Sequence, residues 1–322
     1  MTDHEAVQPE KALRRACDLL GAALLVGLLA GTGALQAEDN PDGVHVDFKN
    51  SLQFSQTALS NWAPGGESSL ALNGDVLAEL RQKRGRFGSQ LTASWLVGLF
   101  KTEDEPVRKS HDQLSIAGVS GFHLRGNIML GALANLTTQI APSYIFDEGV
   151  VQALGGNPDD GIKTGNLLSP GYLELGLGFR YLYPKPMVGL IVAPLMLKQT
   201  IIMDEDIREL DETLPSGLYG NEGKTVQSEL GAHLKLVFQA PLMKNVTASG
   251  HGTLFTEYAD PDVDAMGLLN IDGKINENLS ANINTTFVFD SDVDTDLTKQ
   301  GKQEKLQIRE VLGIKLVYAF SL

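Results

Sequence analysis

Apolar and polar residues alternate along most of the chain after the first forty or so positions. Near the C-terminus, Leu312, Ile314 and Leu316 alternate with Gly313 and Lys315. Such alternation places every second side chain on the same face of a β-strand. Runs of this kind predict twelve strands at about residues 44–60, 68–82, 86–101, 111–125, 127–145, 170–183, 186–203, 224–240, 245–259, 265–275, 278–290 and 304–322.

Short and long connections alternate between these predicted strands. Turns of one to four residues, such as Gly126, are followed by longer and mostly acidic loops such as 146–169 and 204–223. Outer-membrane β-barrels have this layout, and most predicted strands exceed the ~9–11 residues that a tilted strand needs to cross a bilayer. A soluble β-sandwich also has alternating strands, but these average only about 5–6 residues. We therefore predict an all-β fold, a transmembrane antiparallel up-and-down β-barrel of about twelve strands.

Residues 1–37 are predicted to be a signal peptide. Three basic residues precede the apolar run Leu19–Leu35, and small residues follow near Ala37, as in secretory signal peptides. The run has 17 residues, close to the length of a membrane anchor, so an uncleaved anchor is the competing interpretation. We expect cleavage, export through the Sec pathway, and one outer-membrane barrel domain over residues 38–322.

Charge and cysteine content narrow the class of partner. The chain carries 40 acidic and 26 basic residues, a formal net charge of −14. This balance argues against a nucleic-acid partner, because a phosphate backbone would be repelled. The single cysteine, Cys17, lies in the predicted signal peptide, so we expect no disulfide in the mature chain.

Several short motifs between Leu52 and the C-terminus share a pattern with one known family. They are a loop motif of Asn61, Trp62, Gly65 and Gly66, the pair Arg108-Lys109 with Asp112, Thr138-Gln139, Leu168–Tyr172, and Phe289-Asp290 with Asp292. In combination they resemble the family catalogued as domain of unknown function 3078, a set of predicted bacterial outer-membrane barrels. The resemblance implies the compartment and the architecture. It implies no reaction, because none is assigned to that family.

The polar phase of the strands is predicted to face the barrel lumen. A turn centred near Met243 would make His233 and His251 diagonal neighbours and would place Glu229 opposite Glu257. Such a Glu/His cluster could bind a divalent metal. Ordinary polar groups of a hydrated interior are the simpler interpretation, and we predict neither a metal nor a cofactor. The candidate lumen-facing residues are Asp75, Glu79, Glu174, Arg180, Glu229, His233, Lys235, His251, Glu257, Asp272, Lys274, Arg309 and Lys315.

Two functions are consistent with these residues. In the first, the protein is a narrow porin-like channel for small solutes, with an acidic rim that favours cations or neutral solutes. In the second, opposite charges close the lumen, and a structural or surface-binding barrel acts through loops 146–169 and 204–223. Twelve strands lie between the filled barrels of about eight strands and the open ones of about sixteen, so strand number does not decide. We favour the channel, and loop 146–169 is long enough to fold inward as a constriction.

An enzyme is the least supported alternative. A lipid-acting barrel enzyme would need a nucleophile beside a histidine, and the chain has no G-x-S-x-G motif. The acidic runs at residues 260–264 and 290–296 lack the Gly and Glu of an EF-hand loop, so we expect a solvated acidic rim. The expected partners are outer-membrane lipid, lipopolysaccharide and the barrel-assembly machinery, which would recognise the C-terminal strand Leu312–Leu322.

Overall fold

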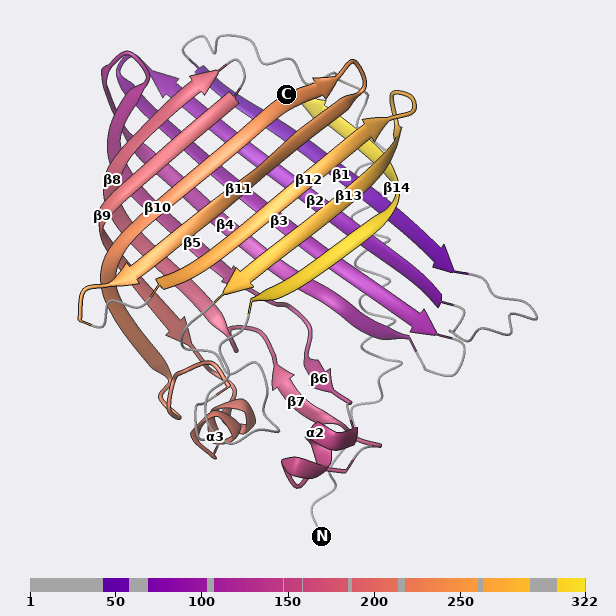
Figure 1. Cartoon of the computed structure of the whole chain (residues 1–322). Coiled ribbons are helices and arrows are strands. Elements are labelled where there is room, and N and C mark those ends of the chain that lie inside the picture. Colours follow the sequence, from indigo (N-terminus) through magenta and orange to yellow (C-terminus); the bar gives the residue numbers. More distant parts are fainter. Residues whose placement is uncertain are drawn as a thin grey trace.

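A computed structural model shows twelve strands closed into one antiparallel barrel (Figure 1). It describes residues 43–57, 69–102, 107–146, 148–157, 159–184, 187–213, 218–259, 263–289 and 306–321. The predicted signal peptide and the loop motif at residues 61–66 lie outside these ranges.

Each barrel strand pairs with its neighbours, and the sheet closes where the first strand pairs with the last. This closed barrel confirms the predicted fold class. The barrel strands are β1 (Gly43–Thr57), β2 (Ser69–Arg84), β3 (Phe87–Thr102), β4 (Arg108–Arg125), β5 (Ile128–Thr138), β8 (Gly171–Pro184), β9 (Met187–Ile201), β10 (Val226–Met243), β11 (Val246–Glu257), β12 (Val263–Lys274), β13 (Leu279–Phe289) and β14 (Gln307–Ser321).

The longest loops contain structure of their own. Between β5 and β8 lie the short strands β6 (Ser143–Ile145) and β7 (Ile162–Gly165), which pair with each other, and the helix α2 (Glu148–Ala153). Helix α3 (Glu205–Thr213) follows β9. Neither of these described helices is long and apolar enough to cross a membrane.

The observed strand ends agree with the predicted ones to within three residues, with one exception. Strand β5 ends at Thr138, although the alternation predicted a strand as far as residue 145. Beyond Thr138, the N–H groups of Ile140 and Ala141 donate to the Asp112 carboxylate. A side chain therefore replaces the backbone acceptors that would have continued the ladder.

Strand pairing separates an apolar outer face from a polar inner face. Outward positions pair with each other, as Leu130 does with Phe179 and Leu177 with Leu195. These four side chains are 44–55 % exposed. An apolar surface of this kind is stable in contact with the hydrocarbon of a lipid bilayer and unfavourable in contact with water. Because all strands of a closed barrel pair on both sides, the backbone is satisfied as well, and the architecture is that of an outer-membrane barrel.

Short turns lie at one end of the barrel and long loops at the other, as predicted. In Figure 1, α2, α3, β6 and β7 extend beyond the loop-side rim. The described part of the loop between β5 and β8 therefore does not form the inward constriction that its length allowed.

The pairing of β10 with β11 corrects the predicted register. His233 lies opposite Phe255, and Glu257 lies opposite Gly231. Met243 belongs to β10 and pairs with Val246, so the turn is one to two residues further along the chain than expected. The register also shifts between Pro241 and Met243. The predicted Glu229–Glu257 pair is therefore wrong.

Candidate functional site: the barrel interior and its loop-side rim

The inward face follows from the strand register. Asp47 on β1 pairs with Glu79 on β2, and the next inward position on β2, Arg81, contacts the Asp47 carboxylate. Carrying the two-residue period from strand to strand extends this face around the barrel. The register places on it Asp75, Glu79, Glu174, Arg180, Glu229, His233, Lys235, His251, Glu257, Asp272, Lys274, Arg309 and Lys315.

A charged cluster occupies the wall near the short turns. The Arg81 Nε atom lies 2.9 Å from Glu79 Oε1, and a second nitrogen of the same guanidinium contacts Asp47. On β8, Arg180 Nη1 donates to Gln90 Oε1 on β3 at 3.1 Å. Since β4 and β5 separate these two strands, the Arg180 side chain lies along the inner wall.

A second charged cluster lies in the loop-side half of the barrel. The Lys198 ammonium is 3.2 Å from Glu229 Oε2 and 2.5 Å from Asp264 Oδ2. It also lies 5.2 Å from the centre of the Phe255 ring. The Lys198 and Glu229 side chains are only 11 % and 8 % exposed. One ammonium between two carboxylates thus compensates charge that would be unfavourable if buried alone.

Apolar side chains also point into the barrel, although the alternation predicted a polar inward face. Ala193, Met196 and Phe255 form a buried cluster, and Leu133 packs against it. Gly176 leaves room for it, because a Cβ there would lie 2.9 Å from the end of the Met196 side chain. This part of the wall is filled, and the open lumen is correspondingly narrower.

The two histidines are not brought together. His233 is opposite Phe255, whereas His251 is opposite Val237, so the predicted diagonal contact is wrong. His233 is nine-tenths buried, and neither ring nitrogen has a hydrogen-bond partner among the described residues. Within the same part of the chain, no group of three or more His, Cys, Asp or Glu side chains is arranged to hold a metal.

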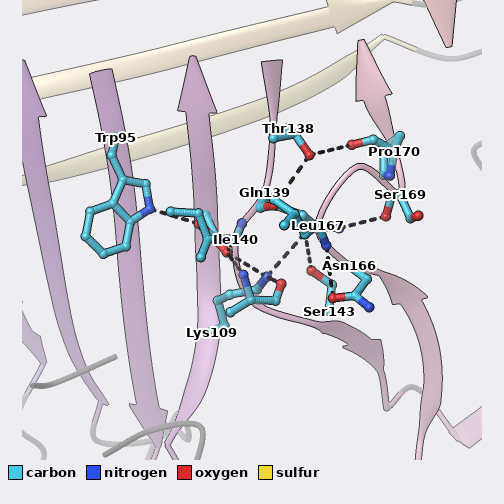
Figure 2. A network of polar contacts seen from close by, with 12 residues as sticks. Trp95, Lys109, Thr138, Gln139, Ile140, Ser143, Asn166, Leu167, Ser169 and Pro170 are labelled. Atoms are coloured by element: carbon cyan, nitrogen blue, oxygen red, sulfur yellow. Dashed lines mark hydrogen bonds and ion pairs between the residues drawn. The ribbon is translucent and has the colours of Figure 1, made fainter. Parts of the chain in front are cut away.

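At the loop-side rim, Asp112 on β4 accepts hydrogen bonds from three segments, whose donors Trp95, Lys109 and Ile140 are labelled in Figure 2. Its carboxylate accepts the Trp95 indole N–H at 3.0 Å and the backbone N–H groups of Ile140 and Ala141 at 3.0 and 2.6 Å. The Lys109 ammonium donates to it at 3.3 Å. The carboxylate side chain is 1 % exposed, so it joins β3, β4 and the end of β5 without contact with solvent.

The same network continues into the loop between β5 and β8 (Figure 2). Lys109 donates to Gln139 Oε1 at 3.2 Å, and Gln139 Nε2 donates to the Ser169 carbonyl at 3.1 Å. The Thr138 hydroxyl donates to the Pro170 carbonyl at 3.1 Å. The two ends of this loop are therefore fastened to each other. The Ser169–Pro170 peptide bond, directly before β8, is cis.

Ser169 also fastens the loop that follows β9. Its hydroxyl oxygen accepts the N–H groups of Met203 and Asp204 at 2.9 and 2.8 Å. The Asp204 carboxylate accepts from Lys163 at 2.5 Å and from Asn166 at 2.7 Å. We use the name rim network for Lys109, Asp112, Thr138, Gln139, Lys163, Asn166, Ser169 and Asp204.

Asp204 is both a helix cap and an ion-pair partner. Its Oδ1 atom accepts the N–H of Ile207 at 3.4 Å at the start of α3, as N-cap carboxylates do. Partial burial alone would raise the pKa of Asp204, but hydrogen bonds from Lys163 and Asn166 bring this pKa below its ordinary value. Burial alone would lower the pKa of Lys163, but its hydrogen bond to Asp204 and the charge of that carboxylate raise it.

The loop after β9 has a small core. Asp211 is 1 % exposed, and its carboxylate accepts the N–H groups of Leu218, Tyr219 and Gly223. The Tyr219 hydroxyl donates to the Thr164 carbonyl on β7 at 2.6 Å. The two long loops are thereby joined into one unit. Its apolar centre consists of Ile202, Ile207 and Leu218, packed with Leu210 and Tyr219.

Residues 54–144 match the model of the family described as "Protein of unknown function (DUF3078)". This match confirms the resemblance over that part of the chain, which includes Lys109, Asp112, Thr138 and Gln139. A search of curated proteins finds no match.

Among solved structures, the chain is similar in fold to three outer-membrane barrels. The translocator domain of the autotransporter NalP from Neisseria meningitidis is 11 % identical, with 95 % of this chain and 97 % of that one covered and a TM-score of 0.37. An outer membrane channel from Pseudomonas putida F1 is 10 % identical, with 90 % and 100 % covered and a TM-score of 0.41. Outer membrane phospholipase A from Escherichia coli is 10 % identical, with 87 % and 94 % covered and a TM-score of 0.35. At these scores, the fold assignment depends on the strand register of the chain itself.

Proposed function

We propose that this outer-membrane barrel is a narrow channel through which small polar solutes pass. The observation that supports the proposal most directly is the exposure of inward-facing charges. The side chains of Asp75, Glu79 and Arg81 are 30 %, 24 % and 35 % exposed, although they face the inside of a closed barrel. Asp75 lies near the middle of β2, so water reaches charged groups well inside the barrel.

The channel is narrow because other inward side chains are packed. Lys198, Glu229 and His233 are buried, and the cluster of Met196 and Phe255 fills the wall beside them. Solutes would therefore pass close to charged groups of both signs, and their passage would depend on size and polarity.

Single-channel recording in planar bilayers tests this function. We expect stable conductance steps from the purified, folded barrel. Glu257→Lys places a positive charge on the inward face, and we expect it to lower the permeability of K⁺ relative to Cl⁻. Glu277→Lys is the matched control, because Glu277 lies in the exposed turn between β12 and β13. Silent bilayers with correctly folded protein would exclude the channel.

A closed barrel that acts through its loops is the second candidate. The observation in its favour is the joined loop unit, which has its own apolar core and the buried Asp211. If the protein gives no conductance while the loops resist protease, this candidate replaces the channel. Hydrolysis of labelled phospholipid by the wild type but not by His251→Ala would instead indicate an enzyme, a function that we do not propose.

The proposal includes the route to the membrane. We propose Sec-dependent export, removal of residues 1–37, insertion by the barrel-assembly machinery through Leu312–Leu322, and contact with lipopolysaccharide. N-terminal sequencing of protein recovered from the outer-membrane fraction tests the first two steps. Recovery from the periplasm without detergent would contradict the location.

A further inference from the structure

Basic side chains gather on the outer face at the short-turn edge of β2 to β5. Arg84 pairs with Phe87 across one turn, and Arg125 pairs with Ile128 across the next. Phe87 pairs in turn with the exposed Phe122, and Ile128 is itself exposed. Because paired residues of antiparallel strands share a face, the register places both arginines on the outer wall, and both are exposed.

The Arg86 guanidinium joins these two turns. Its Nε atom donates to the carbonyl of His123 and its Nη2 atom to the carbonyl of Leu124, each at 3.0 Å. In the reverse direction, the N–H of His123 donates to the carbonyl of Arg86 at 2.7 Å. Arg86 is therefore held beside Arg125. We use the name basic edge for Arg84, Arg86 and Arg125.

Neither turn supplies a carboxylate to compensate the basic edge, because residues 82–88 and 122–128 contain no Asp or Glu. By contrast, the short turn between β10 and β11 carries one basic residue, Lys244, and the turn between β12 and β13 carries Glu277. Guanidinium groups bind phosphate oxygens through paired hydrogen bonds, and basic residues at a membrane surface attract anionic lipid. The position and the charge of the basic edge therefore fit the phosphate of a lipid headgroup.

An apolar depression of about 530 Å³ lies on the outer wall further along β4 and β5. Two pairs of small residues form its floor, Gly118 with Ala134 and Ser120 with Ala132, which are direct partners across the two strands. Leucines of β8 and β9 line one side, among them the exposed Leu177. Four small side chains beside one another thus leave a hollow among larger apolar ones. We call it the outer depression.

The depth of the outer depression matches one acyl chain anchored at the basic edge. Along β4, five to seven residues separate Arg125 from Ser120 and Gly118. At ~3.3 Å per residue and a tilt of about 40°, they correspond to roughly 13–18 Å of depth in the membrane. This is about half of a hydrocarbon core of ~30 Å, which is the reach of one leaflet. The rings of Phe87 and Phe122, with centres 5.5 Å apart, continue the apolar surface between the two parts.

We propose that the basic edge and the outer depression together bind one anionic phospholipid of the periplasmic leaflet. Its phosphate lies at Arg84, Arg86 and Arg125, and one of its acyl chains fills the outer depression. Short turns of such barrels face the periplasm, so the headgroup belongs to the phospholipid leaflet and not to lipopolysaccharide, which lies on the side of the long loops. The site is on the outer wall, so it goes beyond the proposed channel and does not depend on whether the lumen conducts.

Native mass spectrometry of the purified, folded barrel in detergent tests the headgroup contact. The probes are phosphatidylglycerol, which is anionic, and phosphatidylcholine with the same acyl chains, which has no net charge. We expect one phosphatidylglycerol to bind at least about tenfold more tightly than phosphatidylcholine. Arg84→Gln and Arg125→Gln should each weaken its binding about fivefold, because each removes one charge at the phosphate. Lys244→Gln is the matched control, because it removes one exposed charge from the same end of the barrel, and it should bind like the wild type.

A second pair of variants tests the outer depression. Ala132→Leu fills its floor and should weaken the binding of phosphatidylglycerol several-fold. Ala281→Leu is the control, because Ala281 is exposed on the outer face of β13, where it pairs with Ile314. A shift in gel mobility on heating, measured for every variant, shows that each barrel is folded.

The outcomes separate the lipid site from the channel. Equal affinity for the two lipids, or an equal loss in Arg84→Gln and Lys244→Gln, would overturn the site. Equal effects of Ala132→Leu and Ala281→Leu would overturn the placement of the acyl chain. Displacement of phosphatidylglycerol by lipopolysaccharide would overturn the assignment to the periplasmic leaflet. Conductance should be unchanged in every variant, because these residues lie outside the lumen, so failure of the lipid site would leave the channel proposal as it stands.

Discussion

Replacing Asp112 by asparagine tests whether the rim network holds the long loops on the barrel. The carboxylate accepts four N–H groups, and one of its oxygens accepts three of them. The side-chain amide of asparagine has one acceptor oxygen and one NH2 donor. Its NH2 group must therefore face either the Trp95 indole N–H or the backbone N–H groups of Ile140 and Ala141. Lys109 also loses its ion-pair partner. Two lost hydrogen bonds to a charged group, at about 1.5 kcal/mol each, destabilise the loop attachment by about 3 kcal/mol.

Trypsin cleavage after Lys163 measures this attachment, because the ion pair with Asp204 and the packing around it protect that bond. We expect Asp112→Asn to be cleaved about a hundredfold faster through local opening, since 1.4 kcal/mol corresponds to a factor of ten. The barrel itself should keep its gel mobility. Asp159→Asn is the control, because Asp159 is exposed in the same loop. Equal cleavage rates for Asp112→Asn and the wild type would refute the role assigned to the carboxylate.

Three further results follow from the structure. Ser169→Ala removes the acceptor of two backbone N–H groups, and hydrogen exchange should show the loop after β9 destabilised by about 2–4 kcal/mol while the barrel amides are unchanged. Because the pKa of Asp204 is lowered, its ionised form stabilises the loop unit at pH values above its ordinary pKa of 3.8, and this stabilisation is lost as the pH falls through the pKa of the folded state. Because the pKa of Lys163 is raised, its charged form stabilises the loop unit below its ordinary pKa of 10.5, and this stabilisation is lost as the pH rises through the pKa of the folded state. Loop exchange, corrected for its intrinsic rate, should therefore rise as the pH falls below 3.8 in the wild type but not in Asp204→Asn. Lys198→Gln removes the ammonium that lies between the Glu229 and Asp264 carboxylates and should lower the urea midpoint of the barrel more than Glu229→Gln does, and the reverse order would contradict the assignment.

Alternation predicted the barrel strands closely because a two-residue period is a property of the strand itself. Once Leu312 and Lys315 are assigned to opposite faces, every neighbour in the same run is assigned with them. Register between strands depends on the turn, and there the prediction for His233 and His251 was wrong. Pro241 suggested the end of a strand, but β10 continues to Met243. A proline removes one donor and leaves its carbonyl, so a strand can pass through it with a local irregularity.

The interior was predicted less completely than the faces. Phe255 and Met196 lie on the inward phase, although the alternation predicted that phase to be polar throughout. An apolar residue among polar ones gives no sign of whether it packs with another strand, because its partners are distant in sequence. Gly176 shows the same limitation, since the space that it leaves for Met196 depends on the pairing of β8 with β9.

The rim network could not be predicted as a site, although several of its members were noticed as separate motifs. Lys109 and Asp112 are close in sequence, but Gln139 and Ser169 reach them only because β5 stops at Thr138 and the chain returns at β8. The carboxylate that ends the ladder is also the one that binds the indole of β3, so strand termination and loop attachment have a common cause. This coupling fastens the two ends of the loop between β5 and β8 to the rim. It also means that a substitution at the rim changes the loops first and the lumen only indirectly, so loop and channel functions can be separated by experiment.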